Sequence, residues 1–262
     1  MNFIRPFSGI EHERFGSKHD GGYVVPKRIM ANCRFLISYG YGHDSNFERQ
    51  FLKISKSNKV QLYDYSINSK ILIRNLTSSI FNRLKIKAGI SFPLYRLKIL
   101  VRYLGLKLLP RLSYYNLKIS KLTDKRLNKI SIADSLEKIS TFSNFILKID
   151  IEGDEYPVIN DTLQEVNLAA VVVIEFHDIS ENLSEFVSLI KNLKKNFFIS
   201  NSHINNFTNI EDGLPKTLEL TLINLRYWNS EGKMKSADRI PSVLDSPNNP
   251  KSPEYLYDFK DC

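Results

Sequence analysis

Short apolar runs recur along the chain with helical patterns between several of them, and this alternation constrains the fold more than any other feature. The runs lie at Arg34–Tyr39, Val60–Tyr63, Phe145–Ile149, Ala170–Glu175, Phe197–Ser200 and Leu218–Leu222. Short continuous apolar runs are typical of strands that are buried on both faces. Strands that alternate with helices form a mostly parallel sheet with helices packed on each side. The sequence therefore predicts an α/β fold.

Helices are predicted where apolar residues recur at helical spacing. Phe47–Ser55 and Leu183–Lys194 have this spacing, and Ile132–Ile139 is a short amphipathic helix with Ser131 as its N-cap. The last two strands are joined by residues 203–215, which have no clear helical pattern. We therefore expect these two strands to form an antiparallel pair at the end of the sheet.

The positive charge of the chain is concentrated in one segment. The formal net charge is +9, yet Asp124 is the only acidic residue between Lys70 and Lys129. A chain of 262 residues is within the range of one α/β domain, so we expect residues 1–262 to form a single domain. A basic amphipathic insertion at about 71–127 is predicted to interrupt it.

Two interpretations of this insertion follow from its composition. In one, the segment is a helical lid whose apolar side packs on the domain, which is the usual reason for apolar residues at helical spacing. In the other, it lies on an anionic membrane surface, where Lys and Arg meet lipid headgroups and apolar residues enter the interface. Nucleic acid is not expected as a partner, because the segment has no recognisable nucleic-acid-binding motif.

The location of the protein is predicted from its targeting signals and cysteines. No apolar run near the N-terminus is long enough for a signal peptide, and no run approaches the ~18 apolar residues of a membrane span. Cys33 and Cys262 lie far apart, with no Cys-x-x-Cys spacing. We therefore expect a cytoplasmic protein, with any peripheral membrane contact on the inner face.

Polar residues follow several predicted strands at the points where the strands end. Ligands of an open parallel sheet bind beyond the carboxyl ends of its strands. The residues at these ends are Gly40, Tyr41, Gly42, His43, Asp44, Asp64, Asp150, Glu152, Glu175, His177, His203, Asn205 and Asn206. A single polar residue at a strand end is often only a cap or a turn residue, but the convergence of these residues at one edge predicts a binding site.

Asp150 and Glu152 form the centre of this predicted site. They alternate with apolar residues, as Lys148 does, so the two carboxylates are expected to project together. Two like charges so close need a cation, a proton or a bound ligand between them. Asp150, Glu152 and Glu175 are therefore candidate ligands for Mg²⁺ or Mn²⁺, and an ion pair with Lys148 is the alternative.

The glycines after the first strand predict a nucleoside site. Gly40 and Gly42 let a ligand approach the backbone, and Asp64, about 20 residues later, can bond ribose hydroxyls. Ser45 stands where a dinucleotide-binding loop has its third glycine, so an adenosine without a pyrophosphate is expected. S-adenosylmethionine is such a ligand.

Several segments resemble the FkbM-type methyltransferases and the related methyltransferase-like proteins. The segments are RFGSKHDGGYVVP, LISYGYGHDSNFERQF, the YDYS turn, FILKIDIEGDEYPVI, VVVIEFHDI, SHINNF and LPKTLELTLIN, in the order of the family. The most distinctive is Lys148–Glu155, and the resemblance covers residues 12–66 and 130–259. It implies a class I methyltransferase fold, with a seven-stranded, mostly parallel sheet and one antiparallel strand. By analogy, it also implies methyl transfer from S-adenosylmethionine to a sugar hydroxyl of a glycan.

The resemblance also indicates residues for the cofactor. Asp20, Gly22 and Tyr23 belong to a segment that the family shares, and we expect it to close over the cofactor, with a plain β-turn as the alternative. The full set of predicted cofactor-binding residues is Asp20, Gly22, Tyr23, Gly40, Tyr41, Gly42, Asp64 and Tyr65.

Methyl transfer to a hydroxyl requires aligned reactants and removal of a proton. His177 and His203 are predicted bases, because the ordinary pKa of histidine, about 6.5, is close to neutrality. Asp150 and Glu152 are the other predicted catalytic residues, with or without a metal. The alternatives are a nucleotide-dependent sugar oxidoreductase or epimerase, which would need the full Gly-x-Gly-x-x-Gly loop, a nucleic-acid methyltransferase, and a non-catalytic membrane-bound module.

Overall fold

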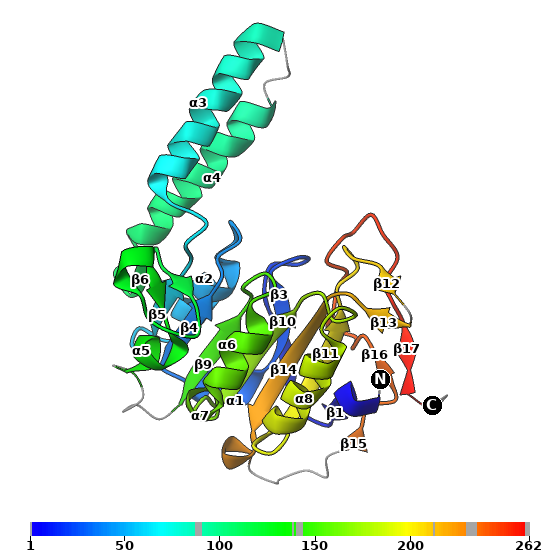
Figure 1. The fold of residues 1–262 in the computed structure, drawn as a ribbon. Helices are drawn as coiled ribbons and strands as arrows, with labels where there is room; N and C mark the ends of the chain where they lie inside the picture. The colour runs from blue at the N-terminus through cyan, green and yellow to red at the C-terminus, as the bar shows by residue number, and fades with distance from the viewer. Residues whose placement is uncertain are drawn as a thin grey trace.

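A seven-stranded sheet forms the centre of the protein (Figure 1). The computed structural model describes residues 2–86, 91–137, 139, 144–211, 213–228 and 235–259. The predicted strands are present as β4 (Phe35–Tyr39), β5 (Lys59–Tyr63), β9 (Phe145–Ile149), β10 (Val171–Phe176), β11 (Phe197–Ile204) and β14 (Leu218–Asn224), and the seventh is β6 (Leu112–Tyr115).

The strand order identifies the fold. It is β6-β5-β4-β9-β10-β14-β11, and β14 runs antiparallel to both of its neighbours while the other pairs are parallel. This order with one reversed strand is the class I methyltransferase arrangement, so the predicted fold class is confirmed. The predicted antiparallel pair is β11 and β14, at one end of the sheet.

Apolar side chains of the central strands alternate between two cores. Ile146, Val171 and Val173 pack on one face, together with side chains from β3 (Gly22–Pro26) and α2 (Asn46–Ile54). The other face holds Leu147, Val172 and Ile174, with side chains from α5 (Ile132–Leu136), α6 (Glu155–Asp161) and α8 (Leu183–Leu193). Both faces of the sheet are covered by other elements, which explains why the strands are continuous apolar runs in the sequence.

The predicted helices are confirmed as α2, α5 and α8. The N-cap of α5 is Ser131, whose Oγ accepts a hydrogen bond from the Asp134 amide at 3.1 Å. The remaining short elements are α1 (Lys27–Asn32), α7 (Leu163–Val166), β1 (Phe7–Ser8), β2 (His12–Gly16), β7 (Lys118–Ile119), β8 (Lys129–Ile130), β12 (Ile210–Glu211), β13 (Leu214–Pro215), β15 (Lys235–Ser236), β16 (Arg239–Ile240), β17 (Tyr257–Asp258) and the 3-10 helices Asn2–Ile4, Lys125–Leu127 and Leu225–Tyr227. Cys262 lies outside the described residues.

The segment expected as one insertion at 71–127 has two different parts. The helices α3 (Ser69–Ile86) and α4 (Ser91–Lys107) pack on each other and project from the domain (Figure 1). The strand β6 follows them and forms the edge of the main sheet. An edge strand with exposed positions lacks the continuous apolar run on which the other strands were predicted, which explains why β6 was missed.

The interpretation of this segment as a lid with its apolar side packed on the domain is wrong for much of the helical pair. Apolar side chains along both helices are exposed, namely Ile73, Ile80, Phe81, Leu94, Tyr95, Leu97, Val101 and Leu104. Near the domain, Leu72 of α3 and Ile99, Tyr103 and Leu106 of α4 pack into its core. No helix in the described ranges combines the length and apolar character needed to cross a bilayer.

Candidate functional site

The register of the sheet brings several predicted site residues into one row. Glu175 of β10 pairs with Glu219 of β14, which in turn pairs with His203 of β11. Asp150 directly follows β9, whose last residue is level with the end of β4. The row therefore runs across the carboxyl ends of the parallel strands, where ligands of this fold class bind.

A cavity of about 280 Å³ lies at this edge. Its lining is strongly acidic, with Lys148 and His177 as its basic residues. The lining residues are Asp20, Gly21, Tyr41, Gly42, Asp44, Phe47, Glu48, Lys148, Asp150, Glu152, Glu175, His177, Asn205, Phe207, Thr208 and Thr217. Asp150, Glu152 and His177 are thus brought together as predicted catalytic residues, whereas His203 is outside this lining.

The glycine at position 40 is required by the close approach of two strand ends. Gly40 has a φ of +90°, and a Cβ atom there would lie 1.8 Å from the backbone oxygen of Asp150. Any other residue would displace one of the two backbones, since real Cβ contacts of this length do not occur. Gly40 therefore allows the glycine loop and the Asp150 turn to form adjacent walls of the cavity.

Lys148 supplies a buried positive charge to the cavity. Its Nζ lies 3.3 Å from Asp150 Oδ2 and 3.4 Å from the Gly40 carbonyl oxygen. Burial lowers the pKa of Lys148, but the charges of Asp150, Glu48 and Glu175 outweigh burial, so the pKa lies above its ordinary value. Lys148 therefore remains an ammonium ion and holds Asp150 in place, as the ion-pair alternative predicted.

Glu175 is a buried carboxyl group close to Asp150. Its Oε1 accepts a hydrogen bond from Asn205 Nδ2 at 2.7 Å, and the Tyr23 hydroxyl lies 3.3 Å from its Oε2 and 3.4 Å from Asp150 Oδ2. Burial and the charge of Asp150 raise the pKa of Glu175 well above its ordinary value. Tyr23, from the hairpin of β2 and β3, therefore bridges the two carboxyl groups.

Glu48 is a cavity residue that the sequence analysis missed. It is a buried residue of α2, and its Oε1 accepts a hydrogen bond from Ser38 Oγ at 2.6 Å. Burial raises its pKa. The sequence contains one signal for this residue. Its carboxylate lies between Phe47 and Phe51, on the apolar face of a predicted helix, where a charged group is unusual.

His177 is held by acidic neighbours on the opposite side of the cavity. Its Nδ1 lies 2.9 Å from Glu155 Oε1, and its Nε2 lies 3.7 Å from Glu152 Oε2. Burial lowers the pKa of His177, but the hydrogen bond with Glu155 and the charge of Glu175 outweigh burial and raise the pKa to about 9. His177 is therefore protonated near neutrality and presents a positive charge to the cavity.

His203 is buried between two carboxylates of the far strands. Its Nδ1 lies 2.9 Å from Glu219 Oε2, and its Nε2 lies 3.3 Å from Glu254 Oε1. Burial lowers its pKa, and the hydrogen bonds with Glu219 and Glu254 outweigh burial and raise the pKa to about 10. The charge and the two partners of His203 are typical of a structural ion pair.

The possible metal ligands differ from the predicted set. Asp150, Glu175 and His177 each offer a ligand atom, and these atoms lie within 4.8 Å of one another, whereas Glu152 does not belong to this group. Lys148 and protonated His177 already supply positive charge beside the carboxylates. A metal needs neutral histidine and unpaired carboxylates, so this group fits a divalent ion poorly.

The predicted cofactor residues lie around the glycine loop. Asp64 Oδ2 accepts a hydrogen bond from the Tyr41 amide at 2.8 Å, and Asp64 Oδ1 accepts from the Ser66 amide and hydroxyl at 2.7 and 2.6 Å. Asp64 is outside the 280 Å³ cavity lining, and the side chain of Tyr65 is exposed. Tyr41 and Gly42 line the cavity next to this turn.

The hairpin that contains the predicted Asp20–Tyr23 segment packs beside the cavity. β2 and β3 pair in an antiparallel manner up to Gly16 and Gly22, and Thr221 Oγ1 of β14 donates a hydrogen bond to the Val24 carbonyl at 2.7 Å. Asp20 and Gly21 form part of the cavity wall, and burial raises the pKa of Asp20. The segment is therefore a hairpin turn that also borders the candidate site.

Comparison with known proteins gives no family for this chain. No protein family matches it, and no curated protein is similar to it. Among solved structures, it is similar to the fibrillarin pre-rRNA processing protein of Methanococcus jannaschii, with 9% identity, a TM-score of 0.38, and coverage of 74% of this chain and 68% of that chain.

Two further solved structures show a similar degree of likeness. One is TrmK of M. capricolum in complex with S-adenosyl-homocysteine, with 11% identity, a TM-score of 0.36, and coverage of 79% of this chain and 70% of that one. The other is the precorrin-6y C5,15-methyltransferase of Geobacter metallireducens, with 8% identity, a TM-score of 0.36, and coverage of 76% and 87%. The likenesses are weak, and the fold class follows from the strand order.

Proposed function

We propose that the protein is an S-adenosylmethionine-dependent methyltransferase of the FkbM type that O-methylates a sugar hydroxyl of a glycan or glycoconjugate. The observation that carries this proposal is the acidic cavity beside the glycine loop, at the carboxyl ends of β4 and β9. The methyl donor is a sulfonium cation, and an acidic cavity favours a cation over a neutral or anionic ligand.

The residues of the glycine loop and the β2–β3 hairpin would hold the cofactor. Gly40 and Gly42 let the nucleoside approach the backbone, and Asp64 orders the loop through the Tyr41 amide. Ribose hydroxyls would take over acceptor positions on Asp64. Asp20, Gly22 and Tyr23 would close over the donor from the hairpin, with Tyr65 at the rim.

We assign Asp150 as the group that accepts the proton of the sugar hydroxyl. In the reaction the bond from sulfur to the methyl carbon breaks, a bond from the methyl carbon to the hydroxyl oxygen forms, and the hydroxyl proton passes to Asp150. The Asp150 side chain is 24% exposed, so a substrate can reach it. His177 and His203 are protonated at neutrality and are poor bases. Glu152 and His177 would orient the acceptor from the opposite wall.

The proposed reaction does not use Mg²⁺ or Mn²⁺, because the positive charges of Lys148 and His177 already balance the carboxylates that would bind the ion.

We propose a cytoplasmic protein whose helical pair α3–α4 contacts the anionic inner face of a membrane. Exposed apolar residues such as Leu94 and Val101 occur there together with exposed Lys98 and Arg102, the combination that binds an anionic interface.

Calorimetry and a turnover assay test the proposed function together. S-adenosylhomocysteine should bind and NAD should not; preferential binding of NAD would indicate an oxidoreductase instead. Asp150→Asn should retain S-adenosylhomocysteine affinity and lose at least about 100-fold in methyl transfer to glycan acceptors, because the amide keeps the shape and cannot take the proton. Turnover of the wild type should persist in EDTA. Comparable turnover in folded Asp150→Asn protein would exclude the proposed proton acceptor.

A further inference from the structure

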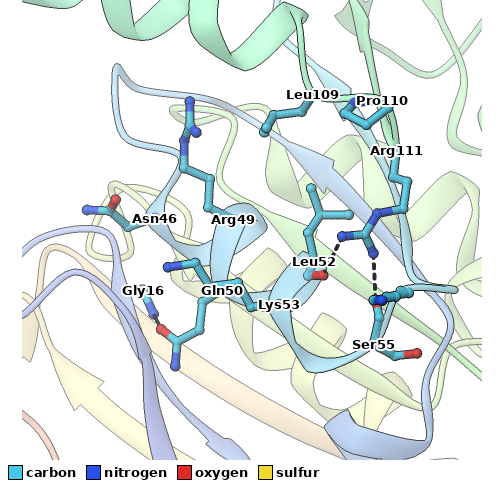
Figure 2. Close-up of a pocket in the computed structure, with 11 residues that line it drawn as sticks. Gly16, Asn46, Arg49, Gln50, Leu52, Lys53, Ser55, Leu109, Pro110 and Arg111 are labelled. Atoms are coloured by element: carbon cyan, nitrogen blue, oxygen red, sulfur yellow. Dashed lines mark hydrogen bonds between the residues drawn. The ribbon is translucent and has the colours of Figure 1, made fainter.

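A second hollow, of about 580 Å³, is also lined by residues of α2, as is the acidic cavity of about 280 Å³, which we call the catalytic cavity. Its charged lining residues are all basic, namely Arg49, Lys53, Lys56 and Arg111, and its lining contains no carboxylate (Figure 2). Within the described ranges, none of these four cations forms an ion pair. The hollow therefore presents unbalanced positive charge.

One of the four cations has a structural role. Arg111 Nη1 donates to the Ser55 carbonyl at 2.5 Å and Nη2 donates to the Leu52 carbonyl at 2.8 Å, so Arg111 caps the carboxyl end of α2 (Figure 2). Lys53 and Lys56 are exposed at the same end of the helix. The charges of these two lysines remain available to a ligand.

Arg49 extends this basic surface toward the amino end of α2. It lies four residues before Lys53, so both side chains share one face of the helix. Among the described residues, its side chain forms one hydrogen bond, from Nε to Ser45 Oγ at 3.0 Å. Its two terminal nitrogens are therefore free to donate to an anion, and a guanidinium can bind two phosphate oxygens at once.

The helix α2 is the common wall of the catalytic cavity and the basic hollow. Glu48 lines the cavity, and the next residue, Arg49, lines the hollow. At the amino end of the helix, Asp44 lines the cavity while Asn46 lines the hollow. A helix is about 10 Å across, so a single extended ligand that occupies both sites passes over this end, where Ser17 of the hairpin bonds to Asp44 and Asn46.

Part of the lining of the hollow is apolar, namely Leu52, Leu109 and Pro110. An inorganic ion alone would gain nothing from these apolar side chains, whereas a phosphate group attached to a base or to a hydrocarbon chain would contact both the cations and the apolar residues. The ligand chemistry is therefore a phosphate anion joined to an apolar group.

We infer that the hollow binds the diphosphate of a sugar substrate that is linked to a nucleotide or lipid carrier, while the sugar lies in the catalytic cavity. This inference rests on the proposed function for the role of the sugar. The diphosphate would lie against Arg49, Lys53 and Lys56, and the carrier would cover Leu52 and Leu109.

Calorimetry at about 150 mM salt, where surface attraction is largely screened, tests the site directly. The probes are inorganic pyrophosphate, uridine diphosphate and farnesyl diphosphate. All three should bind, and Lys53→Gln/Lys56→Gln should weaken each by about tenfold, the equivalent of one charge-assisted hydrogen bond. Tighter binding of uridine diphosphate or of farnesyl diphosphate identifies the carrier as a nucleotide or a lipid.

The matched control is Lys191→Gln/Lys195→Gln, which removes the same charge from exposed positions on and after α8. It should bind the probes as the wild type does. Absence of saturable binding, equal affinity in the Lys53/Lys56 variant, or preferential binding of single-stranded RNA would overturn the inference. S-adenosylhomocysteine binding is measured on the same samples, so failure of the cofactor assignment is distinguished from failure of the anion site.

Discussion

Lys148 Nζ lies 3.3 Å from Asp150 Oδ2, which places a buried ammonium ion beside the carboxylate that we assign to the proton transfer. Glu48 and Glu175 also act on this ammonium, and together with Asp150 they outweigh burial and keep its pKa above the ordinary value. Lys148 is therefore a buried cation that offsets the charges of three carboxyl groups of the cavity.

Replacing Lys148 by Met should destabilise the protein by about 3–5 kcal/mol, because the buried carboxylates lose their compensating charge. Urea denaturation followed by circular dichroism measures the free energy of unfolding. The control, Lys195→Met, changes an exposed lysine and should stay within about 0.5 kcal/mol of the wild type. A Lys148→Met protein as stable as this control would show that Lys148 does not neutralise the cluster.

Asp64→Ala should weaken S-adenosylhomocysteine binding by at least about tenfold, because ribose hydroxyls lose a hydrogen-bond acceptor. Calorimetry measures the affinity. Asp64 also holds the Tyr41 and Ser66 amides, so the melting temperature is recorded on the same samples. Asp161→Ala, at a surface ion pair with Lys121, is the control for loss of a carboxylate. Unchanged affinity in folded Asp64→Ala protein would count against the cofactor assignment.

The ion pairs of His203 should make the stability depend on pH. The pKa of His203 is raised to about 10 in the folded protein, above the ordinary value of 6.5. Its contribution is thus fully present below pH 6.5 and is lost as the pH rises toward 10. The difference in unfolding free energy between wild type and His203→Gln should be about 3 kcal/mol at pH 6 and much smaller at pH 10.

Glu254→Gln provides the check on this assignment. It removes one of the two partners of His203 and leaves Glu219 in place. An NMR titration of His203 should therefore show a lower pKa than in the wild type, still above 6.5. A pH-independent difference between wild type and His203→Gln would mean that His203 is neutral in the folded protein.

The helical pair should bind anionic membranes through charge and apolar contact together. The variant Lys70→Gln/Arg74→Gln/Lys98→Gln/Arg102→Gln should sediment with phosphatidylglycerol vesicles at least about 100-fold more weakly, since each basic residue contributes roughly 1 kcal/mol at such a surface. The control removes the same charge elsewhere, with Lys191, Lys195, Lys235 and Lys251 changed to Gln. Equal sedimentation of the two variants would reject membrane contact through α3 and α4.

The sequence by itself determined the elements whose two faces are both buried. Continuous apolar runs predicted β4, β9 and β14 close to their observed bounds, because a strand that is buried on both faces has apolar residues at successive positions. The reversed last strand also followed from the sequence, since a connection without a helix favours an antiparallel pair. The fold class could therefore be predicted from the sequence alone.

Only the tertiary structure decided which strand-end residues meet. His177 and His203 follow the same sequence rule, yet one borders the cavity and the other is buried between Glu219 and Glu254. Glu48 enters the cavity from a helix. These outcomes depend on contacts between segments far apart in the chain, which local periodicity does not report. The exposure of the apolar residues on α4 has the same origin, because helical spacing marks an apolar face but not what covers it.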